Sequence, residues 1–411
     1  MDKAKSHQQL GLELDLFTFS ELVGSGLPLF TPKGATLRRV LQNYIDNLLK
    51  KEGYQFVWIP HIAKKELYEK SGHLEKFSVD MFPSMNAKGR EYILKPANCP
   101  HHIQIFSRKP LSYKEMPQRY AESTTQYRSE QSGELEGLAR VLGLTLDDSH
   151  VFARPDQVKE EFGRALRINK QMLEDFKLEH WIRLSCWDPK NPKKYLGDKK
   201  TWEEMQKLME EILAELNIKY KKVEGEAAFY GPKMDLMVTD SLGKEWQLST
   251  IQVDFNLPER FDLYYIDEKG QHQRPVMLHR ATFGSYERFM AMIIEHFQGS
   301  FPLWLSPVQV EIIPIADRHK EYAQSIVKKL EKEEIRVELD DRSETMQAKI
   351  RDATLQKVPF MGIIGDREVE SSKLKIENGM ISIRTREGKD LGQVKIPDFL
   401  HKLKDQIDKK I

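Results

Sequence analysis

The chain has 411 residues, of which 40% are hydrophobic and 31% are charged, a composition typical of a soluble globular protein with two or three domains. Lys and Arg number 64 against 63 Asp and Glu, so the net charge of +1 excludes a strong overall attraction to nucleic acid or membrane. Only two cysteines, Cys99 and Cys186, argue against a disulfide scaffold. Since the sequence has neither a membrane-spanning apolar run nor a signal peptide, we expect a cytoplasmic protein with no membrane contact.

The first third of the chain begins with a helix and a strand. Apolar residues at helical spacing predict a helix over 35–51, and the apolar run 54–60 predicts a strand. These two elements could serve packing alone or form a dimer contact. Cys99 lies between two prolines, and we expect a helix to begin at His101 or His102, because proline suits a first helical turn.

A predicted hairpin over residues 119–152 is the central feature of the next part. Its first strand ends at 127–130, a polar loop follows, and a second extended run covers 138–146. Strands joined by short turns predict an antiparallel sheet. Further helices are predicted over 156–176, 202–216 and 284–297, and further strands over 182–187, 246–255, 261–266 and 276–280, with a turn at 227–236 that leads into another strand.

The pattern changes near residue 301, where strands and helices begin to alternate. This alternation predicts a mostly parallel sheet flanked by helices. We therefore expect an α+β domain built on an antiparallel sheet over 1–300 and a smaller α/β domain over 301–411. The predicted strands are 308–313, 337–339, 360–364, 374–377 and 380–384, and the predicted helices are 320–330, 346–355 and 397–407.

Two groups of residues could carry chemistry. Arg128 and Arg140 stand at the margins of the hairpin loop, where fixed guanidinium charges suit phosphate oxygens, although a surface hairpin with ordinary charges would look the same. Cys99, His150 and His279 are far apart in sequence, so no local zinc-finger spacing exists. If the sheet brings them together, three N/S ligands with an open position would form a functional zinc site, whereas a lone buried cysteine is the simpler alternative.

Several stretches carry a resemblance to a known family. The regions around Pro60, Arg128 and Arg288 resemble the three signature motifs of class II aminoacyl-tRNA synthetases, and their detail resembles the threonyl-tRNA synthetase family. The resemblance extends from about Leu10 to the end of the chain. The stretches that carry it are KPANCPHHIQIF, YRSEQSGEL, TLDDSHVF, AFYGPKMDL, QLSTIQVDFNLPERF, PVMLHRATFGSYERF, VPFMGIIGDREVE and IRTREGKDLG.

The resemblance implies a two-step reaction. Threonine and ATP would give threonyl-adenylate and pyrophosphate, and the threonyl group would then pass to the terminal ribose of its tRNA. Larger members of the family carry two further N-terminal domains, one of them for editing, and we expect this chain to begin directly with the catalytic unit.

The resemblance also assigns a zinc site. Zinc held by Cys99, His150 and His279 would bind the amino group and side-chain hydroxyl of threonine, Asp148 would accept the hydroxyl hydrogen bond, and Tyr230 would help to fix the amino group. An apolar pocket separates near-isosteres by only about 100-fold. Valine offers a metal no second donor, so the zinc would serve as a template for recognition.

The ATP site follows from the same resemblance. Arg128 would hold the α-phosphate and the substrate carboxylate, where its charge stabilises the transition state. Glu130 would read the adenine amino group, Arg140 would contact the γ-phosphate, and Arg288 would stack over adenine. Magnesium would accompany the phosphates.

Further residues match the family at less central positions. Gln247 and Gln252 match positions near the ribose and α-phosphate, Lys233 lies beside the same pocket, and His73 matches a histidine of the transfer step. In the C-terminal domain, which resembles an anticodon-binding domain, Glu368 and Arg384 match the anticodon readers. A homodimer would form through the helix and strand of residues 35–60.

The sequence departs from the family pattern near the expected adenine site. Ala97 replaces a usual methionine, and Leu144 replaces an aromatic residue under adenine. Loss of ring stacking, worth about 0.5–1.5 kcal/mol, predicts a weaker ATP site. Leu142 and Leu146 stand where arginine and glutamine are common, and Glu136 stands where histidine often does.

Two other classes of function remain open. One is a non-catalytic paralogue that binds tRNA or threonine, which the leucine substitutions would favour. The other is a metal-dependent hydrolase, which would need a general base beside the metal. Arg128, Arg140 and Arg288 argue against both classes, because neither needs three guanidinium groups that face phosphates.

Overall fold

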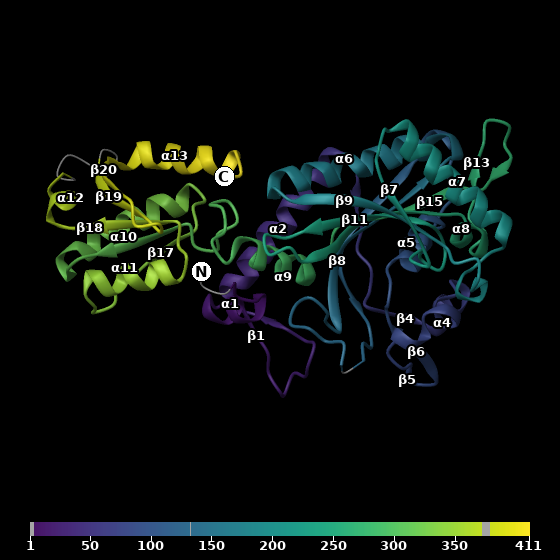
Figure 1. The fold of residues 1–411 in the computed structure, drawn as a ribbon, viewed down its shortest axis with the longest axis horizontal. Coiled ribbons are helices and arrows are strands. Elements are labelled where there is room, and N and C mark those ends of the chain that lie inside the picture. Colours follow the sequence, from purple (N-terminus) through teal and green to yellow (C-terminus); the bar gives the residue numbers. More distant parts are fainter. Residues whose placement is uncertain (1–3, 132, 372–378) are drawn as a thin grey trace. The chain divides into compact units, whose positions relative to one another are not determined.

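The computed structural model describes residues 4–131, 133–371 and 379–411 (Figure 1). The chain forms two compact units. The smaller unit consists of Met1–Ser20, Leu29–Leu41 and Ile293–Ile411, and the larger unit consists of Glu21–Pro28 and Gln42–Met292. Among the described residues, no helix is long and apolar enough to cross a membrane.

An eight-stranded sheet is the centre of the larger unit (Figure 1). The strand order is β10-β9-β11-β12-β15-β8-β7-β3, and every neighbouring pair is antiparallel except β10–β9 and β3–β7 at the two edges. The predicted antiparallel sheet is confirmed. Its strands are β3 (Gln55–Phe56), β7 (Gln118–Tyr127), β8 (Gly143–Ala153), β9 (Glu179–Cys186), β10 (Lys221–Glu224), β11 (Lys233–Thr239), β12 (Glu245–Asp254) and β15 (Val276–Ser285).

Helices pack against both faces of this sheet. On one face, Phe176 of α6 (Val158–Phe176) contacts Tyr44 of α2 (Pro32–Lys51), Phe283 of β15 and Phe289 of α9 (Tyr286–Phe297). In α2, α6 and α9 the apolar residues recur at helical spacing, which is why these helices could be predicted from the sequence. On the other face, Phe106 of α5 (Cys99–Phe106) stacks on a phenylalanine of β8.

Shorter elements complete the larger unit. A three-stranded sheet has the order β4-β6-β5 and precedes α5 in the chain, and a two-stranded β13–β14 hairpin precedes β15. The remaining elements are β4 (Ile62–Lys64), α3 (Lys65–Lys70), α4 (His73–Lys76), β5 (Met85–Ala87), β6 (Arg90–Leu94), α7 (Lys199–Glu215), α8 (Asn256–Arg260), β13 (Tyr265–Ile266) and β14 (His272–Gln273).

The second strand of the hairpin over 119–152 differs from the prediction. It begins at Gly143 and extends to Ala153, so the apolar residues from 138 onward belong to a loop. The loop closes where the Arg128 amide donates to the Leu142 carbonyl at 2.8 Å, and the Leu142 amide donates to the Gly26 carbonyl at 2.8 Å. The carbonyl of Leu142 therefore still bonds across the hairpin, whereas its amide pairs with a segment outside it.

Three other predicted boundaries were wrong. The predicted strand over 261–266 is extended only at Tyr265–Ile266 (β13), because the preceding residues form the turn that ends α8, where the Phe261 amide donates to the Leu257 carbonyl. The predicted strand over 54–60 pairs only at Gln55–Phe56, where it meets β7 in parallel. Helix α5 begins at Cys99, earlier than expected.

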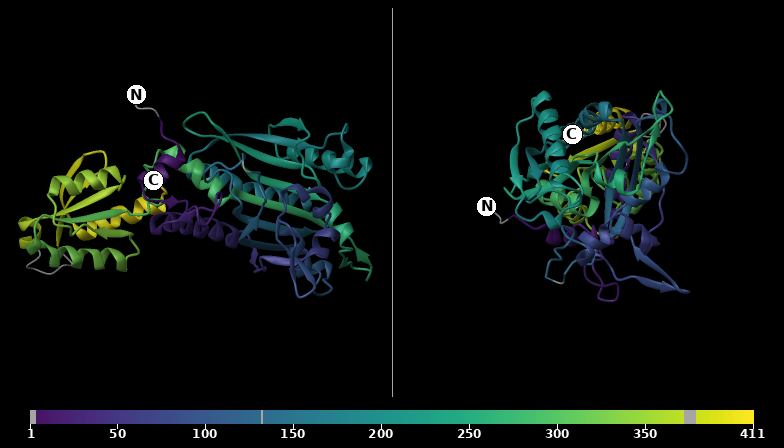
Figure 2. Two further views of the ribbon diagram at one scale, coloured as in Figure 1. Left: turned by 90° about the horizontal axis from the view of Figure 1, so that it is seen from below. Right: turned by 90° about the vertical axis from the view of Figure 1, so that its right-hand side faces the viewer.

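The smaller unit contains a five-stranded sheet of order β17-β16-β18-β19-β20 with helices on both faces (Figure 2). Strands β17, β16 and β18 are parallel, but β18–β19 and β19–β20 are antiparallel, so the sheet is mixed. The predicted strand 374–377 lies outside the described residues. The elements are α1 (His7–Glu13), β1 (Phe17–Thr18), β2 (Leu29–Phe30), β16 (Val310–Pro314), α10 (Lys320–Lys332), β17 (Val337–Leu339), α11 (Met346–Leu355), β18 (Phe360–Ile364), α12 (Asp366–Ser371), β19 (Met380–Thr385), β20 (Asp390–Lys395) and α13 (Ile396–Asp408).

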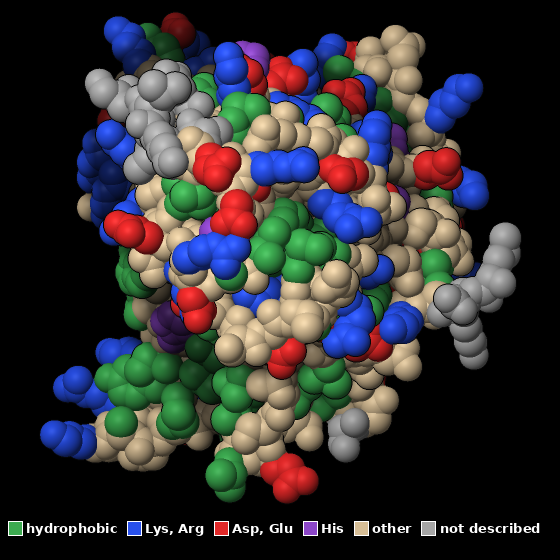
Figure 3. Space-filling model, turned by 90° about the vertical axis from the view of Figure 1, so that its left-hand side faces the viewer, with side chains coloured by type: hydrophobic (Ala, Val, Ile, Leu, Met, Phe, Trp, Pro, Cys, Tyr) green, Lys and Arg blue, Asp and Glu red, His purple; other side chains and the backbone are tan. Residues whose placement is uncertain are grey.

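Two apolar layers hold this mixed sheet. Ile312 packs with α10 and α13 on one side, and Ile313, the next residue along β16, packs with Ala353 of α11 on the other. This alternation is expected when both faces of a strand are covered. On the face of the molecule drawn in Figure 3, basic and acidic side chains are interspersed, as on an ordinary solvated surface.

Candidate functional site

The strand register brings three potential metal ligands together. His150 on β8 and His279 on β15 are directly paired in the antiparallel ladder, and Cys99 lies at the start of α5. The ligand atoms of these three residues lie within 4.8 Å of one another, and each residue is at most 4% exposed. Burial lowers the pKa of His150, which favours the neutral imidazole that a metal requires.

Neighbouring side chains orient both imidazole rings. Nε2 of His279 lies 3.0 Å from Oδ2 of Asp254, and Nδ1 of His150 lies 2.7 Å from Nδ1 of His102. These contacts leave Nδ1 of His279 and Nε2 of His150 for a metal. Support of this kind is typical of metal sites, so the donor set fits a zinc ion.

Burial raises the pKa of the Cys99 thiol, so without a cation this residue holds its proton. A bound divalent cation reverses this preference, because it stabilises the thiolate directly.

The residues assigned to threonine lie beside this cluster. Asp148 is two residues from His150 on the same strand face and accepts a hydrogen bond from Nδ2 of Asn98 at 2.9 Å. Burial raises the pKa of Asp148. Tyr230 stacks on His279 with ring centroids 4.6 Å apart, and its hydroxyl donates to Oε1 of Gln252 at 2.5 Å. Gln252 thereby links the metal cluster to the neighbouring cavity.

A cavity of about 550 Å³ lies on the same face of the sheet. Its lining includes most of the predicted ATP residues, which are Arg128, Glu130, Arg140, Gln247, Gln252 and Arg288. Leu144 and Leu146 also line it, whereas Leu142 lies in the preceding loop. That Leu144 and Leu146 lie beside a bound nucleotide stays a prediction.

The three arginines of the cavity have different surroundings. The guanidinium of Arg128 lies over the ring of Phe77 at 5.4 Å, and its Nε has no hydrogen-bond partner among the described residues. Burial lowers the pKa of Arg128 and of Arg288. Arg140 instead pairs with Glu130 at 2.7 Å. Arg140, which was assigned to the γ-phosphate, and Glu130, which was assigned to adenine, thus form an ion pair with each other.

Lys233 lies next to the cavity rather than in its lining, since it stands opposite Gln252 in the pairing of β11 with β12. Its ammonium lies 3.0 Å from Oδ2 of the fully buried Asp235. Arg183 pairs with the same carboxylate at 3.0 Å, and Nε2 of Gln247 donates to it at 3.1 Å. Asp235 therefore holds Lys233 and Gln247 at one edge of the site.

His73 begins α4 and lies against the metal cluster. Its Nε2 is 3.8 Å from Sγ of Cys99, and its Nδ1 is 2.8 Å from Oγ of Ser71. Burial lowers the pKa of His73 to about 3, so the ring is neutral at ordinary pH.

The predicted anticodon residues lie in the smaller unit. Glu368 of α12 is 6% exposed and accepts hydrogen bonds from the Gly365 amide, Oγ of Ser382 and Nε2 of Gln393. Its carboxylate therefore holds α12 against β19 and β20. Arg384 lies two residues beyond Ser382 on β19 and is partly exposed.

Sequence reasoning missed the residues that support the site. His102, Asp254 and Asn98 stand within the quoted stretches KPANCPHHIQIF and QLSTIQVDFNLPERF, but their partners are distant in the chain. Glu122 was also missed, although it stands opposite Asp148 on β7 and lies 3.6 Å from His102. The available signal was the alternation of polar residues along a strand that is otherwise buried.

Comparison with known proteins identifies the family to which the two parts of the chain belong. Residues 77–297 match the family described as tRNA synthetase class II core domain (G, H, P, S and T), and residues 309–406 match the anticodon binding domain family. The fold and site therefore define a class II tRNA synthetase core joined to an anticodon-binding domain.

Individual relatives indicate which kind of class II tRNA synthetase the chain resembles. The chain is 48% identical over 415 residues to a threonine--tRNA ligase of Cytophaga hutchinsonii, covering 100% of this chain and 63% of the relative. It is 48% identical over 387 residues to that of Deinococcus radiodurans, covering 94% of this chain and 59% of the relative. The chain thus spans about 60% of the length of these curated relatives.

A solved structure from Cryptosporidium parvum, described as the RNA binding domain of threonyl-tRNA synthetase, superimposes with a TM-score of 0.91. It is 33% identical and the match covers 98% of both chains. The chain belongs to the threonyl-tRNA synthetase family.

Proposed function

We propose that this chain attaches threonine to its tRNA through a threonyl-adenylate intermediate. The observation that carries the proposal is the position of three potential metal ligands, Cys99, His150 and His279, beside a cavity of about 550 Å³ that three arginines line. Amino-acid recognition and nucleotide binding can then occur on one face of one sheet. The family membership supports the same reaction class.

Cys99, His150 and His279 would hold a zinc ion, which when bound supplies a Lewis-acidic template for the amino and hydroxyl groups of threonine. Asp148 would accept the hydrogen bond of the hydroxyl, since Asn98 already fixes the other carboxylate oxygen. Tyr230 would orient the amino group from its position against His279. Serine and threonine could use this arrangement, whereas valine could not.

On the nucleotide side, Arg128 would bind the α-phosphate, because its guanidinium carries an unpaired N–H group within a largely buried setting. Arg288 would lie over adenine. Arg140 would have to leave Glu130 to reach the γ-phosphate, and this exchange would also free Glu130 for the adenine amino group. Gln247 and Gln252 would contact ribose and α-phosphate, with Lys233 beside them and magnesium on the phosphates.

The second step would use the neutral ring of His73, which can accept a proton from a ribose hydroxyl. Glu368 and Arg384 would contribute to anticodon recognition in a domain that we place at 301–411, after a catalytic domain at 1–300. A homodimer would form through 35–60, where Phe56 is 48% and Trp58 is 85% exposed. The two free cysteines support a cytoplasmic setting.

The test is threonine-dependent ATP–pyrophosphate exchange, with serine and valine as competing amino acids. We expect exchange with threonine, none with valine, loss after metal is removed by a chelator, and recovery with zinc. Charging of tRNA with labelled threonine then tests the second step. Exchange with valine, or no exchange by folded protein that contains zinc, would refute the proposal.

One observation favours a second candidate, a non-catalytic paralogue that binds threonine or tRNA. Leu144 and Leu146 line the nucleotide cavity and offer neither ring stacking nor a hydrogen bond there. In that case threonine would bind to the zinc-loaded protein in calorimetry, but exchange would be absent at saturating ATP.

A further inference from the structure

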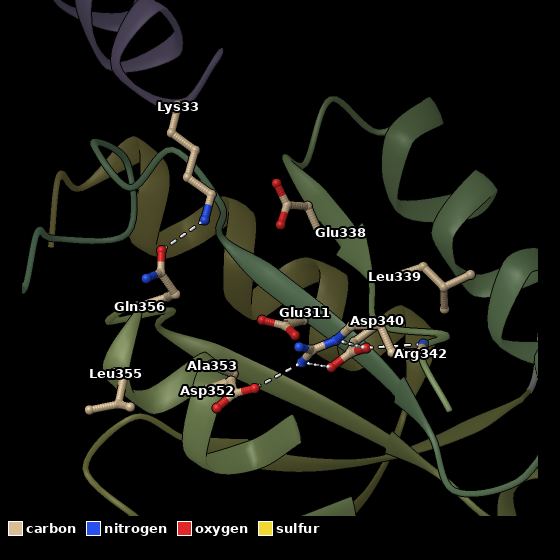
Figure 4. Close-up of a pocket in the computed structure, with 10 residues that line it drawn as sticks. All are labelled: Lys33, Glu311, Glu338, Leu339, Asp340, Arg342, Asp352, Ala353, Leu355 and Gln356. Carbon is tan, nitrogen blue, oxygen red and sulfur yellow. Dashed lines mark hydrogen bonds and ion pairs between the residues drawn. The ribbon is translucent and has the colours of Figure 1, made fainter. Parts of the chain in front are cut away.

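A second cavity, of about 450 Å³, lies in the smaller unit and is unrelated to the synthetase site (Figure 4). It is lined by the strands β16 and β17, by the helix α11 and by Lys33 of α2. Four carboxylates and two cations face it. The carboxylates are Glu311, Glu338, Asp340 and Asp352, and the cations are Lys33 and Arg342.

Both cations already have partners. Arg342 binds Asp340 through Nε at 2.9 Å and through Nη2 at 2.7 Å, and its Nη2 also reaches Asp352 at 3.1 Å. Lys33 donates to Oε1 of Gln356 at 2.9 Å. These contacts, drawn in Figure 4, involve Asp340 and Asp352 but neither Glu311 nor Glu338.

Glu311 and Glu338 have no hydrogen-bond or ion-pair partner among the described residues. They are paired in the parallel register of β16 and β17, so their side chains leave the sheet on the same face. Glu311 is only 9% exposed, and burial together with Asp340 and Glu338 raises its pKa to about 7. An unpaired carboxylate is unfavourable at this depth, because burial removes its hydration without replacing it.

The geometry argues against a metal ion at this place. Among the described residues, the carboxylate oxygens of this cavity do not converge as Cys99, His150 and His279 do. A larger cation can bridge separated carboxylates, and α11 adds the apolar side chains of Ala353 and Leu355 to the wall. Glu338 and Leu355 are exposed, so the cavity can be reached from solvent.

We propose that this cavity binds an organic cation. Its ammonium or guanidinium group would lie between Glu311 and Glu338, and its carbon chain would lie along Ala353 and Leu355. Such a group occurs in free polyamines and in the lysine or arginine side chain of a partner protein. The proposal does not depend on the aminoacylation reaction.

The experiment is isothermal titration calorimetry on the full chain, freed of nucleic acid, at constant salt. The probes are 1,5-diaminopentane, spermidine, Nα-acetyl-lysinamide and magnesium chloride. We expect saturable binding of one amine per chain. Equal affinity for acetyl-lysinamide and diaminopentane would identify a protein side chain as the natural ligand, whereas clearly tighter binding of the diamine would identify a free polyamine.

Matched variants test the two carboxylates. Glu311→Gln should weaken amine binding at least tenfold, and Glu338→Gln, at an exposed position that leaves folding intact, should also weaken it. Glu321→Gln on the exposed surface of α10 is the control and should bind as the unmodified protein does. If Glu338→Gln binds as tightly as the control, the proposal is wrong. Saturable magnesium binding without amine binding would also overturn it.

The pH dependence gives an independent readout. Deprotonation of Glu311 strengthens binding, so the affinity should rise between pH 6 and pH 8, while the amines stay charged over this range. The other charged groups that face Glu311 are Glu338, Asp340, Asp352, Arg342 and Lys33. At pH 7, binding should release a proton, detected as a heat that depends on the buffer. Affinity independent of pH would contradict the assignment to Glu311.

Discussion

The contact between Asp254 and His279 makes a sharp prediction about metal affinity. Asp254 is fully buried, and each of its two carboxylate oxygens has its own hydrogen-bond partner. Oδ2 lies 3.0 Å from Nε2 of His279, and Oδ1 accepts the amide of Leu257 at 3.0 Å. In Asp254→Asn, one of these two acceptors becomes an N–H donor, whichever way the amide is turned. The imidazole then loses its orientation, or the Leu257 amide in the first turn of α8 loses its acceptor.

The expected loss follows from this geometry. Without an acceptor at Nε2, His279 can place its proton on Nδ1, the nitrogen that the structure leaves for metal. Loss of such support typically weakens metal binding by about 10–100-fold, which corresponds to about 1.4–2.7 kcal/mol. The metal-free protein should also lose about 1–3 kcal/mol of stability, because a buried polar atom is left unpaired.

The assay is competition for zinc between the protein and a chromophoric chelator, with circular dichroism to confirm folding. Asp262→Asn is a matched control, because Asp262 is 87% exposed and its carboxylate pairs with the surface residue Arg274 at 3.2 Å. Its zinc affinity should be unchanged. If folded Asp254→Asn holds zinc as tightly as this control, the assignment of the ring nitrogens is wrong.

Four further predictions test other parts of the molecule. Arg128→Lys keeps the charge but loses the planar fork, so the rate of ATP–pyrophosphate exchange should fall about 100-fold while the thermal midpoint stays within a few degrees. Leu144→Phe should restore ring stacking in the cavity and lower the KM for ATP in steady-state kinetics, by a factor that corresponds to about 0.5–1.5 kcal/mol. Trp58→Asp, at an 85% exposed position, should convert a dimer to a monomer in sedimentation velocity, and an unchanged sedimentation coefficient would exclude this surface as the contact. The pKa of Glu311 is raised to about 7, so its ionisation lowers the stability of the folded protein as the pH rises from about 4.5 to 7. In calorimetric melting, Glu311→Gln should therefore be more stable than the unmodified protein at pH 8, by up to about 3 kcal/mol, but similar to it at pH 5.

The sequence predicted those parts of the fold whose signal is local. Helices α2 and α6 carry apolar residues at a helical period, and their predicted extents lie close to those observed. Local pattern failed at Leu138 and Phe261, which are buried apolar residues in a loop and at a helix end. An apolar residue buried by tertiary packing looks the same in sequence as one buried in a strand.

The site could be predicted only in part, for a related reason. Cys99, His150 and His279 were assigned through family resemblance, since nothing in their spacing joins them. Asp254 and His102 were not assigned, because their role depends on contacts with residues far away in the chain. The pairing of Arg140 with Glu130 could not be predicted either, since both residues were expected to face the nucleotide.

The register of the sheet explains why such distant residues form one site. Along a regular strand, residues an even number apart share a face, so Gln247 and Gln252, which are an odd number apart, should face opposite sides. Between these positions the pairing of β11 with β12 shifts, from Asp235 opposite Thr250 to Met237 opposite Gln247. The extra residue in β12 returns Gln247 to the face of Gln252, and both then line the same cavity.

A second register shift, between β15 and β8, also brings residues to the cavity. Between β15 and β8, Ala281 stands opposite Asp148, but the next pair is Ser285 with Leu146. The additional residues of β15 carry Ser285 and the start of α9 over the cavity, so that Arg288 reaches it. Regular pairing suffices to assemble the metal cluster, because His150 and His279 are direct partners. The cavity that Arg128, Arg140 and Arg288 line instead depends on two breaks in the ladder, which no periodic pattern in the sequence could have indicated.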